Sequence, residues 1–469
     1  MSFTKILCIF YFDFQRVKNN LIKVKQMDLD KNFIPEDSYD FIVIGGGPAG
    51  SVFSTLVAKE GYNVLVLEAS KFPRFAVGEI IAPTAIWRIW NRMGITKEML
   101  DPLFAKKWGA NWITPKGEYL SFDQDVFPDD EVCHAHVYQL DRAVYDEFLL
   151  NHARANDVVA LEEAKVENLL YDEDGRMNGV VFNRHGRSFE VRSKLVIDAS
   201  GRANFIPKKL DLRMEIEELH SFSCFAHWEG CERDKGKRAG DISLLFTEDN
   251  LWYWWAPLKS PKASIGIVAD RNVHWEEYSK DPEAFYMKWV ANNPILQERI
   301  KNAKRITDFK YAEKAKKNGA KDPSLLTDFH TKSSQSVGNG WVLVGDTLGF
   351  VDPVFSLGLH IIHSGGAFLA DAAIKGMKEN NLSQEFLEKE YYQKYEDEFT
   401  DVLAIIQQWA ENYYNPRFTN TFLRWGNKYS RIKDIYTRTI IGFEKDAIEQ
   451  FVNLFPGIGS YETQKAEAS

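Results

Sequence analysis

Four short, predominantly apolar stretches stand out along the chain, each followed by polar or turn-forming residues. They are Tyr39–Ile44, Asn63–Glu68, Lys194–Asp198 and Trp341–Asp346. Runs of this kind are typical of strands buried on both faces, as in a parallel sheet. Because the four runs lie far apart in the sequence, we expect one α/β domain assembled from separated pieces.

Other parts of the chain show different patterns. Aromatic and polar residues alternate from about Ser221 to Val268, which predicts strands of an antiparallel sheet. Residues Asp141–Ala155 have apolar positions at helical spacing, and most of the chain from Ser383 onward also has a helical pattern. The sequence therefore predicts a parallel-sheet domain with an antiparallel insertion and a helical C-terminal region.

A glycine-rich loop follows the first apolar run. Gly45, Gly47 and Gly50 have the G-x-G-x-x-G spacing, Ala49 lies inside the loop, and Glu68 ends the next strand. In a dinucleotide fold these glycines allow a tight turn, close approach to the pyrophosphate and close helix packing, while the acid binds a ribose hydroxyl. The start of the following helix attracts the phosphates. The alternative for an isolated glycine pattern is a structural turn, but the strand, helix and acid together predict dinucleotide binding.

Composition narrows the possible partners. The 469 residues are 45% hydrophobic and 27% charged, as expected for a globular protein of two or three lobes. The net charge of -9 argues against a nucleic-acid partner, because phosphate binding requires a basic surface. No segment is long and apolar enough to span a bilayer, so we expect no integral membrane segment.

The start of the chain and its cysteines indicate the compartment. The apolar stretch Ile6–Phe12 is short and has no small-residue cleavage site after it, which disfavours a signal peptide. Met27 is a candidate for the natural start. The four cysteines lack the paired spacing of a zinc site, so we expect free thiols, no metal and a cytoplasmic protein. They are Cys8, Cys133, Cys224 and Cys231.

Two later segments indicate that the dinucleotide is FAD. Lys194–Arg202 resembles the second flavin signature of the flavoprotein monooxygenase superfamily, and Val344–Pro353 resembles the third. The resemblance implies that Asp346 binds the ribityl chain and that the helix after Pro353, near Gly358, points at the isoalloxazine ring. Gln139–Arg142 resembles the element whose arginine, here Arg142, leans on the flavin. The resemblance covers about residues 39–414.

The chain shows no second glycine-rich nucleotide loop. A reduced nicotinamide would therefore have no dedicated domain. We expect electrons to arrive as FADH2 from a separate NAD(P)H flavin reductase.

Residues Trp252–Pro257 resemble the W-x-W-x-I-P motif of the flavin-dependent halogenases, with Ala256 in place of isoleucine. In that family Trp252 and Trp254 would wall the flavin from the substrate pocket, so that only a small oxidant passes. The alternative is an aromatic strand that fills a core. The position of the motif and its final proline favour the first interpretation.

A second segment, Phe104–Ala110, resembles the K-x-G-A segment of halogenases that act on phenols and carrier-tethered pyrroles. Lys107 matches the catalytic lysine, and Lys106 is the neighbour without a role. An ammonium can hold hypohalous acid by hydrogen bond, or form a haloamine if its pKa is lowered. The alternative, a solvated surface lysine, is common, so the interpretation depends on the register with Gly109 and Ala110.

A third segment, Phe350–Gly358, resembles the F-x-x-P-x-x-S-x-G segment of the same family. The backbone N–H groups of Leu357 and Gly358 would bind the halide. Tryptophan halogenases have a glutamate in this loop, whereas this chain has Phe355. The pattern therefore resembles the phenol and pyrrole branch.

These resemblances imply an FADH2-dependent halogenase. O2 would form a flavin C4a-hydroperoxide, chloride or bromide would attack it, and Lys107 would direct the resulting hypohalous acid onto an electron-rich aromatic. A phenolic or polyketide-like substrate, free or carrier-tethered, is favoured. A flavin-dependent hydroxylase, a prenyl-chain reductase and a non-catalytic flavin-binding subunit remain the alternatives.

The expected fold is α/β with α+β insertions, built on a Rossmann-like FAD-binding domain of the flavoprotein monooxygenase type. We expect a flexible leader at residues 1–37 and an FAD-binding domain at 38–220 plus 330–382. An antiparallel-sheet substrate domain is expected at 221–329, a helical region at 383–462 and a tail at 463–469.

Overall fold

The structure is a computed structural model of the whole chain. It describes residues 33–81, 84–123, 134–216, 219–307, 325–326, 330–412, 414–442 and 444–454. The expectations about Met27, the start of the leader, Cys8, Cys133 and the tail concern residues outside these ranges.

The four predicted apolar strands lie in one sheet. Its order is β19-β20-β10-β1-β2-β7, and β1 pairs in parallel with both β10 and β2. The bounds are β1 Ser38–Ile44, β2 Val64–Leu67, β7 Val159–Leu161, β10 Arg187–Asp198, β19 Val337–Gly338 and β20 Trp341–Leu343. The continuous apolar runs are explained by burial of each strand on both faces, since every residue of β2 is buried.

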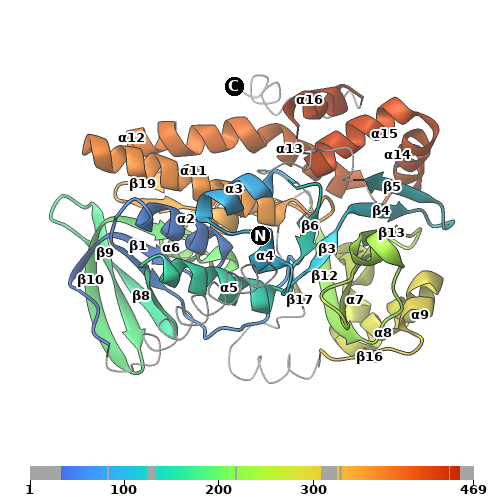
Figure 1. Cartoon of the computed structure of the whole chain (residues 1–469), viewed down its shortest axis with the longest axis horizontal. Coiled ribbons are helices and arrows are strands. Elements are labelled where there is room, and N and C mark those ends of the chain that lie inside the picture. Colours follow the sequence, from blue (N-terminus) through green and yellow to red (C-terminus); the bar gives the residue numbers. More distant parts are fainter. Residues whose placement is uncertain are drawn as a thin grey trace, which may run out of the picture.

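Helices cover this sheet, and a hairpin extends it. The helices nearest the glycine loop are α2 (Pro48–Ala58), α5 (Arg142–Ala155) and α11 (Gly358–Glu379), and Figure 1 shows α11 running across the molecule above α2. The hairpin consists of β9 (Met177–Arg184) and the first part of β10, and β8 (Ala164–Tyr171) pairs with β9. Smaller elements are α3 Ile86–Met93, α4 Lys97–Leu100, α6 Phe205–Lys209, β3 Ala105–Lys107, β6 Val137–Gln139, β11 Arg213–Glu215, β18 Thr331–Ser333 and β21 Gly349–Phe350.

A second sheet has the order β16-β12-β15-β14-β13-β4-β5. Its strands are β4 Gly109–Ile113, β5 Tyr119–Asp123, β12 Ser221–Glu229, β13 Ile242–Phe246, β14 Leu251–Ala256, β15 Lys262–Asp270 and β16 Lys304–Arg305, with β17 Leu325–Leu326 on β12. The sheet extends beyond the expected residues 221–329, because β4 pairs in parallel with β13. That pairing joins segments far apart in the chain, which local alternation does not reveal.

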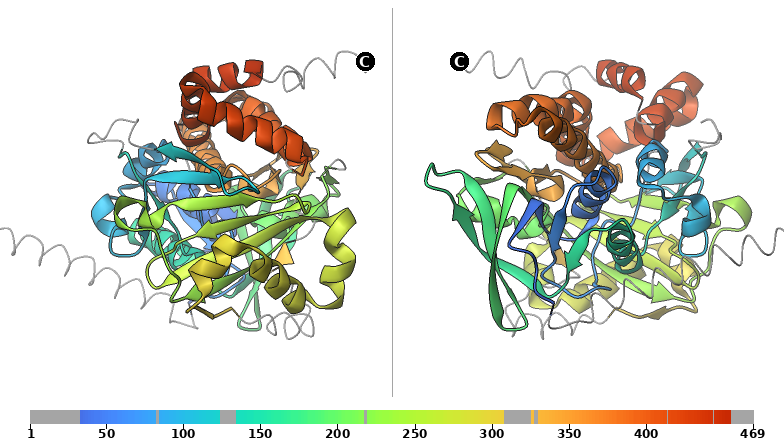
Figure 2. Two further views of the ribbon diagram at one scale, coloured as in Figure 1. Left: turned by 90° about the vertical axis from the view of Figure 1, so that its right-hand side faces the viewer. Right: turned by 60° about the vertical axis from the view of Figure 1, so that its left-hand side comes forward.

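Both faces of this second sheet are buried. On β14, Trp252, Trp254 and Ala256 join the core shared with the first sheet, whereas Tyr253 and Trp255 join a second core. The second core is covered by α7 (Arg271–Lys280), α8 (Pro282–Asn292) and α9 (Pro294–Ile300), drawn in yellow in Figure 2. The sheet therefore forms a layer between these helices and the rest of the molecule.

The C-terminal region is helical, as predicted. Its helices are α12 Gln384–Leu387, α13 Gln393–Asn412, α14 Pro416–Lys428, α15 Ser430–Thr437 and α16 Lys445–Leu454, shown in orange and red in Figure 2. Within the described ranges, no helix is long and apolar enough to cross a membrane.

Trp112 of β4 connects this helical region to both sheets. It is 1% exposed, and its ring lies 4.9 Å from that of Trp409 on α13 and 5.4 Å from that of Phe422 on α14. It also lies 5.6 Å from Phe246 of β13 and stacks on Phe355 at 5.7 Å. One indole thus fills the junction of three structural units.

We predict that Trp112→Ala lowers the free energy of unfolding by about 3–5 kcal/mol, because it opens a cavity that its neighbours cannot fill. Urea unfolding followed by circular dichroism measures this change. Tyr119→Ala on the neighbouring strand β5, where the side chain is 48% exposed, should change stability by no more than about 0.5 kcal/mol. Equal losses in the two variants would contradict the prediction.

Candidate functional site

The glycine loop is shaped to leave room for a ligand. Gly45 has φ +104°, and a Cβ there would lie 2.5 Å from the carbonyl oxygen of Ala199. Gly47 is the N-cap of α2 and provides no side-chain cap, and Pro48 and Ala49 begin the helix. The first N–H groups of α2 therefore lack intrahelical partners and point toward the space where a phosphate would bind.

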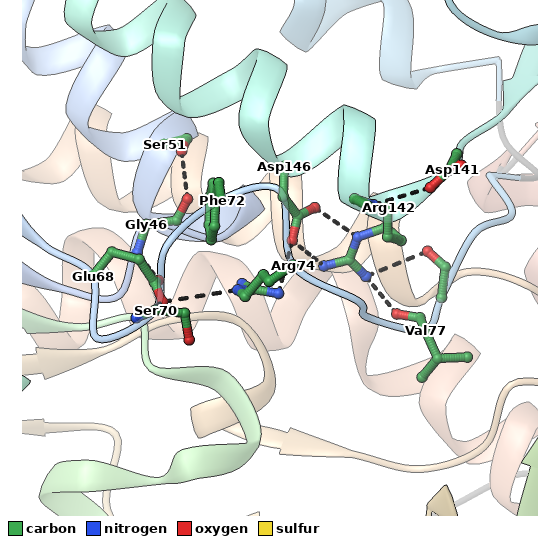
Figure 3. Close-up of polar contacts among 12 residues, drawn as sticks. Gly46, Ser51, Glu68, Ser70, Phe72, Arg74, Val77, Asp141, Arg142 and Asp146 are labelled. Carbon is green, nitrogen blue, oxygen red and sulfur yellow. Dashed lines mark hydrogen bonds and ion pairs between the residues drawn. The ribbon is translucent and has the colours of Figure 1, made fainter. Parts of the chain in front are cut away.

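Glu68 lies against this loop. Its carboxylate accepts hydrogen bonds from the backbone N–H groups of Gly46 (2.9 Å) and Ser70 (2.8 Å), and the residue is 6% exposed (Figure 3). These bonds fix the orientation of the carboxylate at the end of β2. A carboxylate has further lone pairs, so Glu68 retains the capacity to accept a ribose hydroxyl.

Arg142 opens α5, whose N-cap Asp141 accepts from the N–H of Ala143. The guanidinium donates to both carboxylate oxygens of Asp146, at 2.7 and 3.0 Å, and to the carbonyl of Val77 at 2.5 Å (Figure 3). Burial disfavours its charge, but Asp146 outweighs this effect and raises the pKa of Arg142. The N–H groups at the edge of the Arg142 guanidinium are thus bound by the protein. Contact between the planar face of the guanidinium and a flavin stays a prediction.

Three further charged residues, Asp146, Arg74 and Asp198, support this region. Asp146 also forms an ion pair with Arg74 at 3.2 Å, and Arg74 lies 3.8 Å from Glu68. Asp198, at the end of β10, accepts from the N–H groups of Ser200 (2.9 Å) and Ile206 (2.6 Å). Sequence gives no sign of the Arg74 contacts, because no local motif contains its partners.

Asp346 lies in the turn η4 (Gly345–Thr347) after β20. Among the described residues, no hydrogen bond or ion pair engages its carboxylate. Burial raises its pKa, and the positive charges of Arg142 and Arg202 oppose that rise. A carboxylate without a hydrogen-bond donor fits the hydroxyl groups of a ribityl chain. The cradle at Gly45, the acid Glu68 and the free acceptor Asp346 together fit FAD.

Lys107 ends the short strand β3, which pairs with β6. Its side chain is fully buried, and Nζ donates to the carbonyl oxygen of Ile81 at 2.8 Å. Burial lowers the pKa of Lys107 to about 7, while the charge of Asp241 acts in the opposite direction. Lys106, by contrast, is 40% exposed at its side chain and pairs with Asp101 at 2.9 Å. The structure thus places the two adjacent lysines in different environments, one buried and one exposed, and the catalytic role of Lys107 stays a prediction.

Asp241 is positioned by a close backbone approach. A Cβ at Gly240 would lie 1.8 Å from the carbonyl oxygen of Lys106, so only glycine allows this contact. Asp241 is fully buried, accepts from the N–H of Trp108 at 2.8 Å and pairs with Arg238 at 2.6 Å. The sequence did not identify Asp241, because it is distant from Lys107 along the chain.

The two motif tryptophans lie on one face of β14. Trp252 is 1% and Trp254 6% exposed, and their ring centroids are 6.4 Å apart. Trp252 lies 6.3 Å from Phe246, which contacts Trp112, which in turn stacks on Phe355. Trp112, on the strand that follows Lys107, thus contacts the loop before Leu357 directly and the tryptophan strand through Phe246.

The proposed halide-binding residues lie at the start of α11. Leu357 is the N-cap, Gly358 is the first helical residue, and Ser356 has φ +57°. The first N–H groups of this long helix have no intrahelical acceptor. Pro353 lies earlier in the same loop, where its carbonyl accepts from the N–H of Ser356 at 2.9 Å. Anion binding by Leu357 and Gly358 is compatible with this geometry and stays a prediction.

A family model described as tryptophan halogenase matches residues 128–456, and one described as FAD dependent oxidoreductase matches residues 40–209. The chain is 30% identical over 353 residues to a 1H-pyrrole-2-carbonyl-[peptidyl-carrier protein] brominase from Pseudoalteromonas luteoviolacea, covering 74% of this chain and 80% of that protein. It is 24% identical over 400 residues to the corresponding chlorinase from Pseudomonas fluorescens, covering 81% and 82%. A solved flavin-dependent brominase shares the fold, with a TM-score of 0.75, 24% identity and coverage of 90% and 98%.

We predict that Glu68→Ala weakens FAD binding roughly ten- to hundredfold, because it removes charge-assisted hydrogen bonds at the loop and the acceptor for the ribose. Titration of the FAD-free protein with FAD, followed by flavin fluorescence, measures the dissociation constant. Glu60→Ala is the control, since Glu60 is exposed and pairs only at the surface with Lys378 at 3.3 Å. Unchanged FAD affinity in Glu68→Ala would remove Glu68 from the binding site.

Proposed function

The chain belongs to the flavin-dependent halogenases, and from this premise we propose that it halogenates an electron-rich aromatic substrate by way of Lys107. It is an FAD-dependent oxidoreductase that uses O2 and chloride or bromide. When bound, reduced FAD would supply two electrons that activate O2, so that one oxygen atom leaves as water and the other converts the halide to hypohalous acid. The residues described above bind the cofactor and direct the oxidant.

The observation that carries the proposal is the environment of Lys107. Lysine is almost never fully buried unless it is paired. Within the described ranges no carboxylate forms an ion pair with Lys107, and its amine has a backbone carbonyl as acceptor. A structural role does not explain such an arrangement, whereas delivery of hypohalous acid by hydrogen bond does. With a pKa of about 7, both the ammonium and the amine are accessible near neutral pH.

The tryptophan face of β14 supports the proposal. Trp252 and Trp254 are bulky and lie in the core shared with the first sheet. We propose that they separate the flavin from the aromatic substrate, so that an organic molecule cannot receive oxygen directly. The halide ion then reaches the oxidant from the start of α11, at Leu357 and Gly358.

The substrate class follows from the loop before α11. Phe355, which replaces the glutamate of tryptophan halogenases, is 2% exposed and stacks on Trp112. This loop has no carboxylate at that position to polarise an indole, so an activated ring such as a phenol is favoured. Relatives include halogenases of carrier-bound pyrrole and a sulochrin halogenase from Aspergillus terreus. We therefore propose a phenolic or polyketide-like aromatic, free or carrier-tethered.

We further propose that a separate NAD(P)H flavin reductase supplies FADH2 in the cytoplasm. The chain contains one glycine-rich nucleotide loop, at Gly45–Gly50. In the described part of the chain no disulfide joins Cys224 to Cys231, as a reducing compartment favours. A hydroxylase or a prenyl-chain reductase would give product without halide. Product formation that depends on chloride or bromide separates the proposal from both.

Lys107→Ala is expected to abolish halogenated product while FAD stays bound and FADH2 is still oxidised, because oxidation of the halide does not require the lysine. Mass spectrometry of reactions with FAD, a reductase, NADH, halide and a panel of phenols measures the product. Lys106→Ala is the matched control, since its side chain pairs with Asp101 at the surface and should retain full yield. Retained halogenation in Lys107→Ala would reject the proposed role.

The product yield per FADH2 oxidised should fall as the pH rises through about 7, because Lys107 then loses the proton with which it holds hypohalous acid. Burial lowers this pKa and Asp241 raises it, so Asp241→Asn should move the loss of yield to lower pH. The control is Asp123→Asn, which removes the other carboxylate paired with Arg238. A yield that instead rises with pH would assign delivery to the neutral amine and its haloamine.

A further inference from the structure

A buried Glu–His pair joins a loop close to Lys107 to the second sheet. Glu79, in the loop that follows Arg74, is 2% exposed, and His227 on β12 is 7% exposed. The Nε2 atom of His227 lies 2.6 Å from a carboxylate oxygen of Glu79. The partners are 148 residues apart in the sequence. Phe75 covers the pair, stacking on Phe225 at 5.2 Å and contacting the His227 ring at 5.2 Å.

The Glu79 segment, residues Val77–Ile81, is fastened at both ends. Arg142 donates to the carbonyl of Val77, as Figure 3 shows, and Lys107 donates to the carbonyl of Ile81 at 2.8 Å. One short segment therefore connects the arginine expected beside the flavin with the lysine proposed to deliver the halogen.

The middle of the segment is fixed by Glu79 itself. Its backbone carbonyl accepts from the N–H of Leu140 at 2.7 Å, and its side chain binds His227. The Leu140 bond accompanies an isolated bridge that pairs Ile80 with Gln139 of β6. Among the described residues, the bond to His227 is what ties the Glu79 side chain to the second sheet. The Ile81 carbonyl, which accepts from Lys107, lies two residues after Glu79. A shift at Glu79 is therefore transmitted directly to Ile81.

A structural explanation of the pair is weak on energetic grounds. Two buried charges seldom stabilise a fold more than well-packed apolar residues of similar size. Burial lowers the pKa of His227, yet the charge and hydrogen bond of Glu79 raise it overall, which favours the protonated imidazolium. The other charged groups that face His227 are Asp141 and Lys262, which pair with each other at 2.9 Å.

We propose that His227 is a positioning residue that, through Glu79, holds the Ile81 carbonyl against Lys107 during halogen delivery. This inference rests on the proposed function of Lys107. Without His227 the amine loses its fixed orientation, and hypohalous acid escapes into solution before it reaches the aromatic ring. The expected defect is therefore in delivery, whereas formation of hypohalous acid continues.

The test compares substrate halogenation with escape of hypohalous acid, which a soluble β-diketone traps. In His227→Leu, FAD affinity and FADH2 oxidation should match the natural protein, while the ratio of halogenated substrate to halogenated trap falls about tenfold or more. Lys262→Met, which removes a cation from the same sheet, should leave the ratio unchanged. The double variant Glu79→Gln with His227→Gln keeps a neutral hydrogen bond and should recover most of the ratio.

A second readout does not require turnover. Acylation of the FAD-bound protein with acetic anhydride, followed by peptide mass spectrometry, reports the accessibility of Lys107 relative to its neighbour Lys106. The relative labelling of Lys107 should rise in His227→Leu and return toward the natural value in the double variant. If His227→Leu does not fold, Glu79→Leu alone, which removes both the carboxylate and its hydrogen bond to His227, replaces it in both experiments.

The outcomes separate this inference from the proposed function. An unchanged product ratio in His227→Leu, an equal fall in Lys262→Met, or no recovery in the double variant would overturn the positioning role. Lys107→Ala is run in parallel. If it keeps its product, the proposed function fails. If it loses product while His227→Leu keeps the natural ratio, only the positioning role fails.

Discussion

Removing an ammonium group from water costs several kcal/mol even after a protein relaxes around it, and Lys107 is fully buried. The surrounding structure offsets this cost only in part. The Ile81 carbonyl accepts one hydrogen bond, and Asp241 contributes a negative charge that opposes the fall in pKa. A lysine in this state is costly for the fold. It is also suitable for chemistry, since its pKa of about 7 lies near neutral pH. The packing around β3 therefore serves to hold the buried Lys107 side chain in place despite its desolvation cost.

That support comes from segments distant in the sequence. The pairing of β3 with β6 brings Lys107 beside Val137. Gly240 lies against the Lys106 carbonyl, and the next residue, Asp241, accepts a hydrogen bond from the N–H of Trp108. The chain then continues directly into β4, which carries Trp112 to the junction of the tryptophan strand and the loop before α11. A rigid aromatic cluster thus fixes the three family motifs relative to one another. Close packing of this kind transmits small displacements, because it leaves little space to absorb them.

The sequence predicted those features that local physics determines. Buried parallel strands were recognisable because each forms a continuous apolar run, and the glycine loop because its spacing combines with a strand, a helix and Glu68. The register with Gly109 and Ala110 singled out Lys107 of an adjacent pair by resemblance, whereas the burial of Lys107 and the exposure of Lys106 became visible only in the structure.

Features that depend on long-range pairing were not predictable in the same way. Neither periodicity nor motif indicates that β4 pairs with β13, that Asp146 engages Arg74 and Arg142 together, or that Glu79 binds His227. His227 occupies an alternating strand in which any polar residue would satisfy the pattern. Its significance comes only from the carboxylate that the fold places 2.6 Å away.

The arrangement also explains how one protein can separate oxidation of a halide from its transfer. The residues proposed to bind the cofactor lie after β1, β2 and β20, whereas Lys107, proposed to deliver the halogen, lies on β3. Segment Val77–Ile81 is bonded to Arg142 at one end and Lys107 at the other. Such a segment can keep Arg142 and Lys107 in a fixed relative position without contacting the oxidant. Because a displacement of about 1 Å can reduce the rate of a well-oriented reaction a hundredfold, the anchor of this segment matters as much as the groups it joins.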